Sequence, residues 1–370
     1  MRSFALCVEN SSRKARKEPD NLYVHDLMTQ LERLQKTGIK RLGTKTRFRY
    51  VTADGGKVSR DDLARIEALV IPPAWKEVAI NRAAGGMLQA VGKDDAGRWQ
   101  YVYHDQHVKK REQKKFERLL KFAESVPQMR RVIGQNLRRR DLGHERVMAC
   151  ILRILSTCFM RAGSQVYANE NGSYGLATLR PKHVRVRGDI VEFDFPGKAQ
   201  VTQHRELRDR AVARIVRALL SHRAPEVFKY QNGDGCFVDV KRRHINQHIK
   251  EVMGERFTSK DFRTWAASLI CACALARVGV EAREGAAARK KKVVKAIKET
   301  AEILGNTPAV CRSAYICPEI LASYDRGEVI DHYFESPEEL VNHRIPHLHK
   351  AERAMLRLLK RNRNGAKSQR

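Results

Sequence analysis

The chain has 370 residues, enough for two domains with a sizeable core, and its 42% of hydrophobic residues excludes a disordered protein. Lys and Arg total 72 against 42 Asp and Glu, a formal net charge of +30 at pH 7 and a pI near 10.1. This excess predicts nucleic acid as the leading partner, ahead of a ribosome-like structural role or a membrane surface. No apolar run reaches the roughly 18 residues of a spanning helix, and no secretory signal opens the chain.

The 8 cysteines do not resemble a disulfide framework. Most lie inside apolar helical patterns, which predicts buried, reduced thiols and a cytoplasmic protein; they are Cys150, Cys158, Cys271, Cys273, Cys311 and Cys317. The pair Cys271 and Cys273 has no matching second pair, so no zinc site is expected there. His244 and His248 in HINQH lack the glutamate of a zincin helix, and we interpret them as helix surface.

The chain opens with a polar, basic stretch, residues 1–20, that predicts a flexible tail. A first globular domain is expected over residues 21–111. It should hold a helix, Asp61–Leu69, and two strands, Met87–Val91 and Trp99–Tyr103. The turn-rich sequence KDDAGR joins the two strands to each other. Ile71-Pro72-Pro73 ends the helix. The basic run Lys109–Lys121 indicates a helix or linker between domains, either solvated or in contact with phosphates.

A second domain is expected over residues 112–345, with a basic helix and tail in 346–370. An apolar stripe predicts a helix that ends near Arg161, with Gly163 as its cap. A strand-rich interval follows, in which Pro196-Gly197 fits a type II turn and leaves Lys198 at the hairpin tip. The rest is largely helical: Leu207–Leu220, His244–Val252 and a buried helix, Phe262–Val278, with Arg263 at its polar entrance.

The stretch IKETAEILGNTPAVCRSAYI, residues 297–316, predicts a helix, a sharp turn and a second helix. Gly305 follows the last periodic residue and can adopt a left-handed cap. Thr307 can cap the next helix, whose first position suits Pro308. The turn brings Tyr315 near the polar Asn306 and several cations; taken alone, a helical tyrosine is usually a packing residue.

Four fragments taken together resemble the small type IB DNA topoisomerases of the poxviral and bacterial group. They contain, in chain order, an arginine, a hairpin lysine, a second arginine, a polar residue and a tyrosine: CFMRAG (158–163), FPGK (195–198), KDFRTW (260–265) and GNTP (305–308) through Tyr315. Upstream, IPPAW (71–75), GRWQYVY (97–103) and YANENGSYGLATL (167–179) also resemble the family. The resemblance covers about residues 40 to 340, which makes it specific.

The resemblance implies an α+β fold, in which a β-rich N-terminal domain and a mainly helical catalytic domain with a β-hairpin region form a C-shaped clamp around duplex DNA. It implies a transient bond between Tyr315 and a 3′ phosphate, rotation of the duplex and resealing. Such an exchange of esters needs no ATP, metal or other cofactor. We expect a monomer in the cytoplasm, associated with the nucleoid.

Elementary chemistry assigns the same roles. Arg161 and Arg263 suit the negative charge of the phosphoryl transition state, because a guanidinium is permanently charged and donates two hydrogen bonds at once. Lys198, on a mobile hairpin, can protonate the departing 5′ oxygen. Tyr315 has an ordinary pKa of about 10 and must lose a proton, to a group that the sequence does not identify. Poxviral members carry His where this chain has Asn306, so we assign Asn306 a hydrogen bond to a non-bridging oxygen and no proton transfer.

The resemblance also implies DNA contacts by Gln100, Tyr101, Tyr103, Tyr167 and Lys260. The first three are expected on a strand face against the major groove, where Gln can pair with adenine and Tyr can contact phosphates; a half-buried sheet with aromatic packing is the alternative. Two other functions stay open. A tyrosine recombinase uses a similar catalytic set, and a DNA-binding architectural protein would need only the positive charge.

Overall fold

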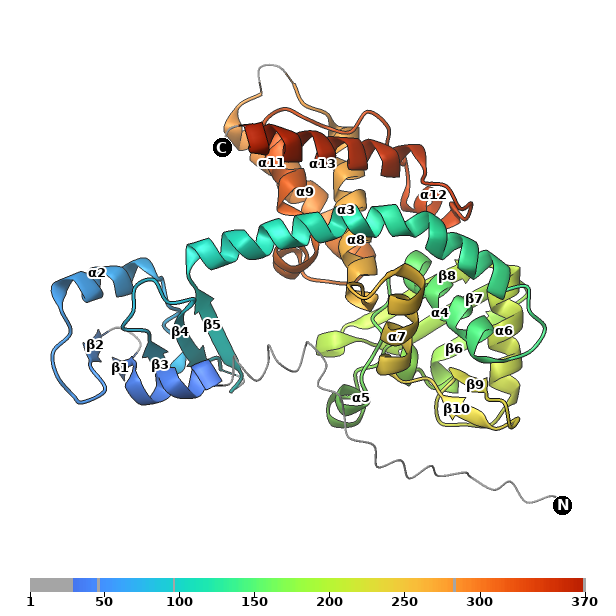
Figure 1. The fold of residues 1–370 in the computed structure, drawn as a ribbon, viewed down its shortest axis with the longest axis horizontal. Helices are drawn as coiled ribbons and strands as arrows, with labels where there is room; N and C mark the ends of the chain where they lie inside the picture. Colours follow the sequence, from blue (N-terminus) through green and yellow to red (C-terminus); the bar gives the residue numbers. More distant parts are fainter. Residues whose placement is uncertain (1–28, 45–46, 96, 282–283, 369–370) are drawn as a thin grey trace. The chain divides into compact units, whose positions relative to one another are not determined.

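The computed structural model of the chain describes residues 29–44, 47–95, 97–281 and 284–368 (Figure 1). The predicted flexible tail, residues 1–20, lies outside the described residues. The chain divides into two compact units, residues 1–113 and 114–370. The first unit is rich in strands and the second is mainly helical, so the predicted α+β class is confirmed.

The first unit is built on an antiparallel sheet of five strands in the order β2-β1-β3-β4-β5. The strands are β1 Ile39–Thr44, β2 Arg47–Val51, β3 Lys76–Ile80, β4 Leu88–Lys93 and β5 Trp99–Tyr103. Residues 29–37 are helical, and α2 spans Arg60–Ala68. The predicted helix and the last two strands are confirmed, whereas β1, β2 and β3 were not predicted.

Apolar side chains cover both faces of this sheet. Leu31 and Leu34, from the helical residues 29–37, pack with Tyr101 and Tyr103 on one face. Ile66 of α2 packs with Val102 on the other face. The alternation of β5 therefore places its two tyrosines on one side, as predicted, with ring centroids 6.3 Å apart.

Arg41 fixes the chain between α2 and β3. Its guanidinium donates to the carbonyl oxygens of Ile71, Pro72 and Trp75, at 3.3, 3.1 and 2.6 Å. Prolines cannot continue α2, so this segment needs partners for its carbonyls, and one arginine supplies them.

The second unit contains most of the helices, a three-stranded antiparallel sheet in the order β6-β7-β8 and the pair β9–β10. The strands are β6 Val184–Arg187, β7 Ile190–Pro196, β8 Thr202–Arg208, β9 Lys229–Gln231 and β10 Phe237–Asp239. The helices are α3 Asp105–Asn136, whose first turns belong to the first unit, α4 His144–Cys158, α5 Gln165–Asn171, α6 Arg210–Ser221, α7 Arg242–Met253, α8 Ser259–Val278, α9 Ala286–Leu304, α10 Pro308–Val310, α11 Pro318–Asp325, α12 Pro337–Asn342 and α13 Lys350–Ser368.

Helix α8 runs through the core of this unit and is buried from Asp261 to Leu275, as its apolar sequence predicts. Its N-terminus is fixed by a capping box, in which the Thr258 backbone N–H and hydroxyl donate to the Asp261 carboxylate at 2.8 and 3.0 Å. Arg118 of α3 pairs with the same carboxylate. The first turn of α8 therefore has a fixed position, which matters because it carries Lys260 and Arg263.

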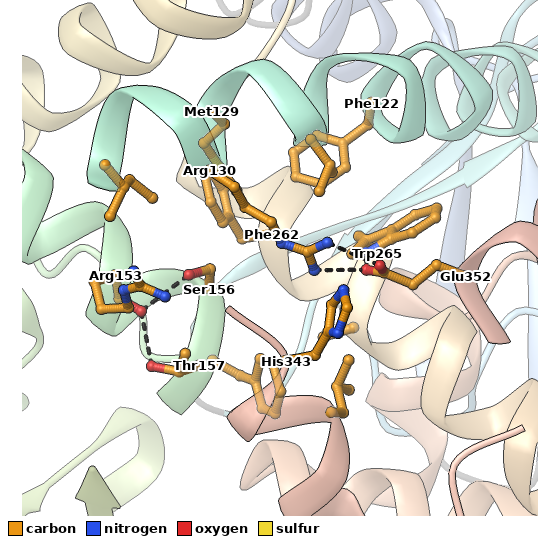
Figure 2. A pocket seen from close by; sticks show the side chains of 15 residues that line it. Phe122, Met129, Arg130, Arg153, Ser156, Thr157, Phe262, Trp265, His343 and Glu352 are labelled. Carbon is orange, nitrogen blue, oxygen red and sulfur yellow. Dashed lines mark hydrogen bonds and ion pairs between the residues drawn. The ribbon is translucent and has the colours of Figure 1, made fainter. Parts of the chain in front are cut away.

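The C-terminal helix α13 is part of the second unit. Glu352, fully buried, accepts a bidentate pair of hydrogen bonds from Arg130 of α3 at 2.8 and 2.9 Å, and Trp265 of α8 donates to it at 3.4 Å. These groups border a cavity of about 30 Å³ (Figure 2). It has room for water but not for a ligand of ordinary size.

The seven described cysteines are all free thiols, and the six predicted to be buried are buried. Among the described residues, no helix has both the length and the apolar character of a membrane span. The interpretation of His244 and His248 as helix surface is wrong for His248, which is only 3% exposed. This histidine lies on the buried stripe of α7 with Ile245 and Ile249, and its ring faces His144 of α4 instead of solvent.

Candidate active site

Arg161 lies in the loop after α4. The helix ends at Cys158, and Phe159, not Gly163, takes the left-handed cap conformation, with φ 53°. Gly163 has another role, because an added Cβ would lie 3.0 Å from the backbone of Gly175. This close approach lets the backbone carbonyl of Arg161 accept a hydrogen bond from Leu176 at 3.0 Å, which fixes the loop.

Arg263, in the first turns of α8, is 3% exposed and joins the ends of two other helices. Its guanidinium donates to the carbonyl oxygen of Phe159 after α4 and, at 2.9 Å, to that of Leu304 at the end of α9. A guanidinium carries five N–H donors, so the two bonds leave donors for another acceptor. The bond to Phe159 also helps to hold that residue in its left-handed conformation.

Asn306 follows α9 in the turn that the sequence predicts. Gly305 is left-handed (φ 63°), the Thr307 side chain caps α10 and Pro308 is its first residue. Arg161 donates to Oδ1 of Asn306, 145 residues away in the chain. The Nδ2 of Asn306 is buried without a hydrogen-bond partner among the described residues. The turn therefore presents one unused N–H₂ donor beside an arginine.

Tyr315 closes a π-helical turn, Cys311–Tyr315, directly after α10. The residues that follow it are anchored. Lys115 of α3 donates to the carbonyl oxygen of Ile316 at 3.0 Å, and the N–H of Cys317 donates to Ser268 of α8 at 3.0 Å. Wide helical turns of this kind are frequent at functional sites, and here the turn lies between two fixed segments.

The Tyr315 ring lies against Arg263, whose guanidinium carbon is 5.0 Å from the ring centroid. Burial alone would raise the pKa of the phenol, but Arg263, Arg161 and Lys260 outweigh it and lower the pKa of Tyr315 below its usual 10. Burial, with Arg161 as a second cause, lowers the pKa of Arg263 to about 10. The structure thus brings together Arg161, Arg263, Asn306 and Tyr315.

Lys198 lies at the tip of the hairpin formed by β7 and β8, as predicted, and is exposed. The predicted type II turn is wrong. Gly197 has φ −92°, whereas that turn needs a positive φ there, and Gln200 instead takes the left-handed position with φ 60°. Five residues, not two, separate the paired Pro196 and Thr202, so Lys198 begins a short 3₁₀ turn. It forms no hydrogen bond or ion pair with the part of the chain that the structure describes.

Gln203 and Arg205 of β8 are also part of this site, and the sequence did not single them out. A Cβ at Gly305 would lie 2.2 Å from Oε1 of Gln203 and 2.8 Å from Nη2 of Arg205, and a Cβ at Gly197 would lie 2.7 Å from Gln203. The pair thus links the hairpin tip to the turn of Asn306. Burial, and then the charge of Arg161, lower the pKa of Arg205 despite the opposing influence of Cys158.

The three arginines of this site, Arg161, Arg205 and Arg263, have no acidic partner in the described ranges. No carboxylate forms an ion pair with Arg161, Arg205 or Arg263 there. Buried charges are normally paired, so converging guanidinium groups without a carboxylate provide a place for an anion such as a phosphate.

Alternation along β8, with Gln203, Arg205 and the buried Leu207 on one face, was the signal that could have identified Arg205.

The predicted DNA contacts lie in both units. Lys260 is exposed in the first turn of α8, and Tyr167 of α5 is 60% exposed. In the first unit, Tyr101 and Tyr103 lie on one face of β5, half-buried against apolar residues. Gln100 alternates to the other side and donates to Asp94 at 2.9 Å, so the expectation that all three lie on one strand face is wrong.

Two protein families match this chain. Residues 105–326 match the catalytic core of eukaryotic DNA topoisomerase I, and residues 47–94 match the N-terminal domain of bacterial DNA topoisomerase IB. The first match covers more than half of the chain and contains Arg161, Lys198, Arg263, Asn306 and Tyr315. The class that the fold and the matches define is therefore that of DNA topoisomerases with a eukaryotic-type catalytic core.

Individual relatives agree with this class. The chain is 31% identical over 308 residues to DNA topoisomerase 1B of Acanthamoeba polyphaga mimivirus, which covers 81% of this chain and 92% of the viral protein. It is 26% identical over 256 residues to DNA topoisomerase 1B of vaccinia virus, which covers 69% and 76%. DNA topoisomerase 1 of Drosophila melanogaster is 24% identical over 209 residues, 53% of this chain and 20% of that protein. The chain belongs to the type IB DNA topoisomerase family.

Proposed function

We propose that this protein relaxes positive and negative supercoils in duplex DNA by opening one strand through a covalent bond between Tyr315 and a 3′ phosphate. The observation that carries the proposal is the position of the Tyr315 ring, 5.0 Å from the guanidinium of Arg263. Arg161, whose charge also acts on Tyr315, donates a hydrogen bond to Asn306. A nucleophile and donors for phosphate oxygens thus come from separate parts of the chain.

In this proposal the phenol oxygen of Tyr315 attacks the phosphorus, the bond from phosphorus to the 5′ oxygen breaks, and that oxygen takes up a proton. Arg161 and Arg263 donate to the non-bridging oxygens, where negative charge increases in the transition state. The positive charges of these two arginines lower the pKa of Tyr315 and so ease the loss of its proton. Reversal of the attack reseals the strand.

Asn306 contributes a neutral hydrogen bond. Its Oδ1 accepts from Arg161, so the amide orientation that fits this contact directs Nδ2 away from the arginine as a free donor. A buried donor without a partner costs free energy, and a phosphate oxygen would satisfy it. We assign Asn306 this bond and no proton transfer.

Lys198 is the proposed general acid for the departing 5′ oxygen. It is exposed at the tip of a five-residue connection, which gives its long side chain freedom to approach bound DNA. The neighbouring Gly197 packs against Gln203, which also contacts Gly305 beside Asn306. The base of the hairpin tip therefore adjoins the proposed site, which places the exposed amine of Lys198 on the connection beside it.

Arg205 is proposed as a positioning residue that acts through Gly305 and Arg161. Gln100, Tyr101, Tyr103, Tyr167 and Lys260 are the proposed DNA contacts, with Lys260 and Tyr167 best exposed for that role. Because Gln100 is bonded to Asp94, it must exchange that bond to contact a base. We expect one protein molecule to act alone on the duplex.

The exchange of one phosphate ester for another conserves bond energy, so the proposed reaction needs neither nucleotide nor metal. The test is relaxation of positively and negatively supercoiled plasmid in EDTA without nucleotide. We expect complete relaxation of both, and none by Tyr315→Phe. Full relaxation by Tyr315→Phe, or inactivity of the folded native protein, would overturn the proposal. The comparisons favour neither a recombinase nor an architectural protein.

A further inference from the structure

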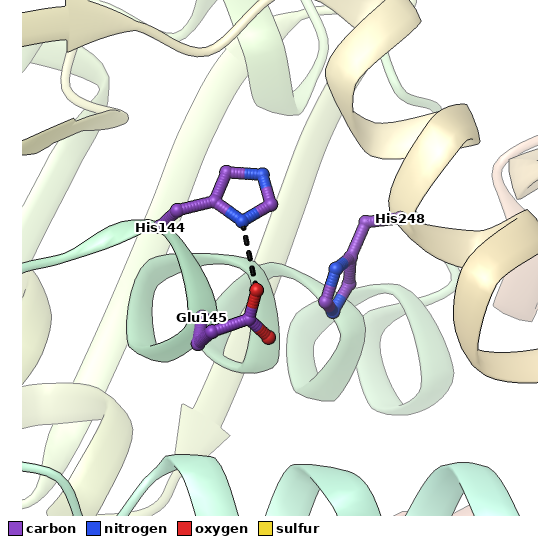
Figure 3. A group of neighbouring side chains, drawn as sticks. All are labelled: His144, Glu145 and His248. Carbon is purple, nitrogen blue, oxygen red and sulfur yellow. Dashed lines mark hydrogen bonds and ion pairs between the residues drawn. The ribbon is translucent and has the colours of Figure 1, made fainter. Parts of the chain in front are cut away.

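Three ligand-type side chains gather at the opposite end of α4 from Arg161. His144 and Glu145 lie in the first turn of α4, and His248 faces them from α7 (Figure 3). One potential ligand atom from each residue lies within 4.8 Å of the others. The helix has 15 residues, so at 1.5 Å per residue this cluster is about 22 Å from the end that leads to Arg161.

His248 is the unusual member of this cluster. It is 97% buried, and both of its ring nitrogens lack a hydrogen-bond partner among the described residues. The nearest carboxylate oxygen of Glu251 is 3.6 Å from Nδ1, too far for a hydrogen bond. Its ring meets that of His144 edge to face, with centroids 5.4 Å apart. Buried polar groups are normally satisfied, so this unpaired imidazole has ring nitrogens available to a ligand that the protein itself does not supply.

We propose that His144, Glu145 and His248 bind a divalent transition-metal ion of the zinc type. Two imidazoles and one carboxylate are ligands that zinc accepts in tetrahedral sites, with water in the fourth position. Glu145 and the nearby Glu251 together match the two positive charges of the ion.

The surroundings contain groups that can orient the ligands. Asn136 at the end of α3 donates to Oε2 of Glu145 at 3.3 Å, and Oε1 of Glu145 is 3.1 Å from Nδ1 of His144. The Tyr230 ring packs edge to face on His144, with centroids 4.9 Å apart. A bound ion would join α4 to α7. Arg161 follows α4, and Arg263 lies in α8, which follows α7. The ion would stabilise the fold without taking part in strand cleavage.

The test uses the full-length protein without a tag, treated with chelator and returned to metal-free buffer. Calorimetric titration with Zn²⁺ is expected to show one ion per chain with a micromolar or lower Kd. Saturating Zn²⁺ should raise Tm by several degrees, since it binds the folded state. Co²⁺ should give the intense visible absorption of a four-coordinate site. The absence of saturable binding to folded protein would overturn the proposal.

Two variants locate the site without opening the core. His144→Ala and Glu145→Gln change partly exposed residues and should each weaken Zn²⁺ binding at least tenfold and reduce the Tm shift. The control is His332→Ala, which removes another histidine beside a carboxylate, Asp331, at 3.3 Å on the surface. Zn²⁺ binding that persists in the first two variants, or that is lost in the control, would place the ion elsewhere and refute the assignment.

Discussion

The guanidinium carbon of Arg263 lies 5.0 Å from the centre of the Tyr315 ring, although 52 positions separate the two residues in the sequence. The same guanidinium donates to the carbonyl oxygens of Phe159 and Leu304. One buried side chain thus fixes the position of the proposed nucleophile relative to the loop of Arg161 and the turn of Asn306.

Replacement of Arg263 by Ala should slow single-turnover strand cleavage by on the order of 10²–10³, since it removes a charged donor to the phosphate. Arg263→Lys should recover little of this loss, because an ammonium cannot reach both carbonyls and the phosphate at once. Arg357→Ala, at an exposed ion pair with Asp331, is the control with unchanged cleavage. Equal rates for Arg263→Lys and the native protein would contradict the role.

The ionisation of Tyr315 gives a pH prediction. Cations lower the pKa of this phenol in the folded protein, so its phenolate forms at lower pH than in a free tyrosine. Arg263→Ala removes the largest of these cationic influences and should move the titration to higher pH. NMR of ring-labelled tyrosine, with Tyr315→Phe to assign the signal, measures the shift. A titration that moves to lower pH in the variant would be inconsistent with this electrostatic account.

Asn306 offers a test of hydrogen bonding without charge. Asn306→Asp keeps the size and the oxygen that faces Arg161 but replaces the unpartnered Nδ2 by a second, negative oxygen. We expect cleavage to fall by more than in Asn306→Ala, for which a loss of on the order of 10 to 10² is reasonable for one neutral donor. Single-turnover rates on a suicide substrate provide the comparison. An Asp variant as fast as native would eliminate the proposed donor role.

Gly305→Ala tests the contact between the hairpin strand β8 and the turn of Asn306. The alanine would have to adopt the left-handed backbone conformation of Gly305, with φ 63°. Its Cβ would also lie 2.2 Å from Oε1 of Gln203. Gly327→Ala is a matched control, with φ 83° but no atom closer than 3.9 Å. Both should lose stability by about 1 kcal/mol or more from backbone strain. Only Gly305→Ala should also slow cleavage in the folded protein; equal rates in the two variants would rule out the coupling.

Local sequence rules predicted those parts of the site that are determined by neighbours in the chain. Gly305, Thr307 and Pro308 adopt the predicted cap, N-cap and first helical position because their backbone preferences act locally. The order of the five proposed catalytic residues came from the resemblance, and the structure brings four of them together. Their chemical roles stay predictions.

Features that depend on distant contacts were missed or wrong. Phe159, not Gly163, ends α4 in a left-handed conformation, where a hydrogen bond from Arg263, 104 residues away, helps to hold it. The alternation along β8 could have placed Arg205 on the inward face, but its close approach to Gly305, 100 residues away in the chain, depends on the fold. His248 lies at helical spacing on the buried stripe of α7 with Ile245 and Ile249, but the identity of the element that covers this stripe, α4, depends on the fold.

The most direct test of the central claim is identification of the residue bonded to DNA. Supercoiled plasmid is incubated with the protein in EDTA, the reaction is stopped with detergent, and the peptide attached to DNA is sequenced by mass spectrometry. The account predicts a single adduct, at Tyr315 and on the 3′ phosphate, that disappears in Tyr315→Phe while DNA binding persists. An adduct on another residue, or on a 5′ phosphate, would contradict it.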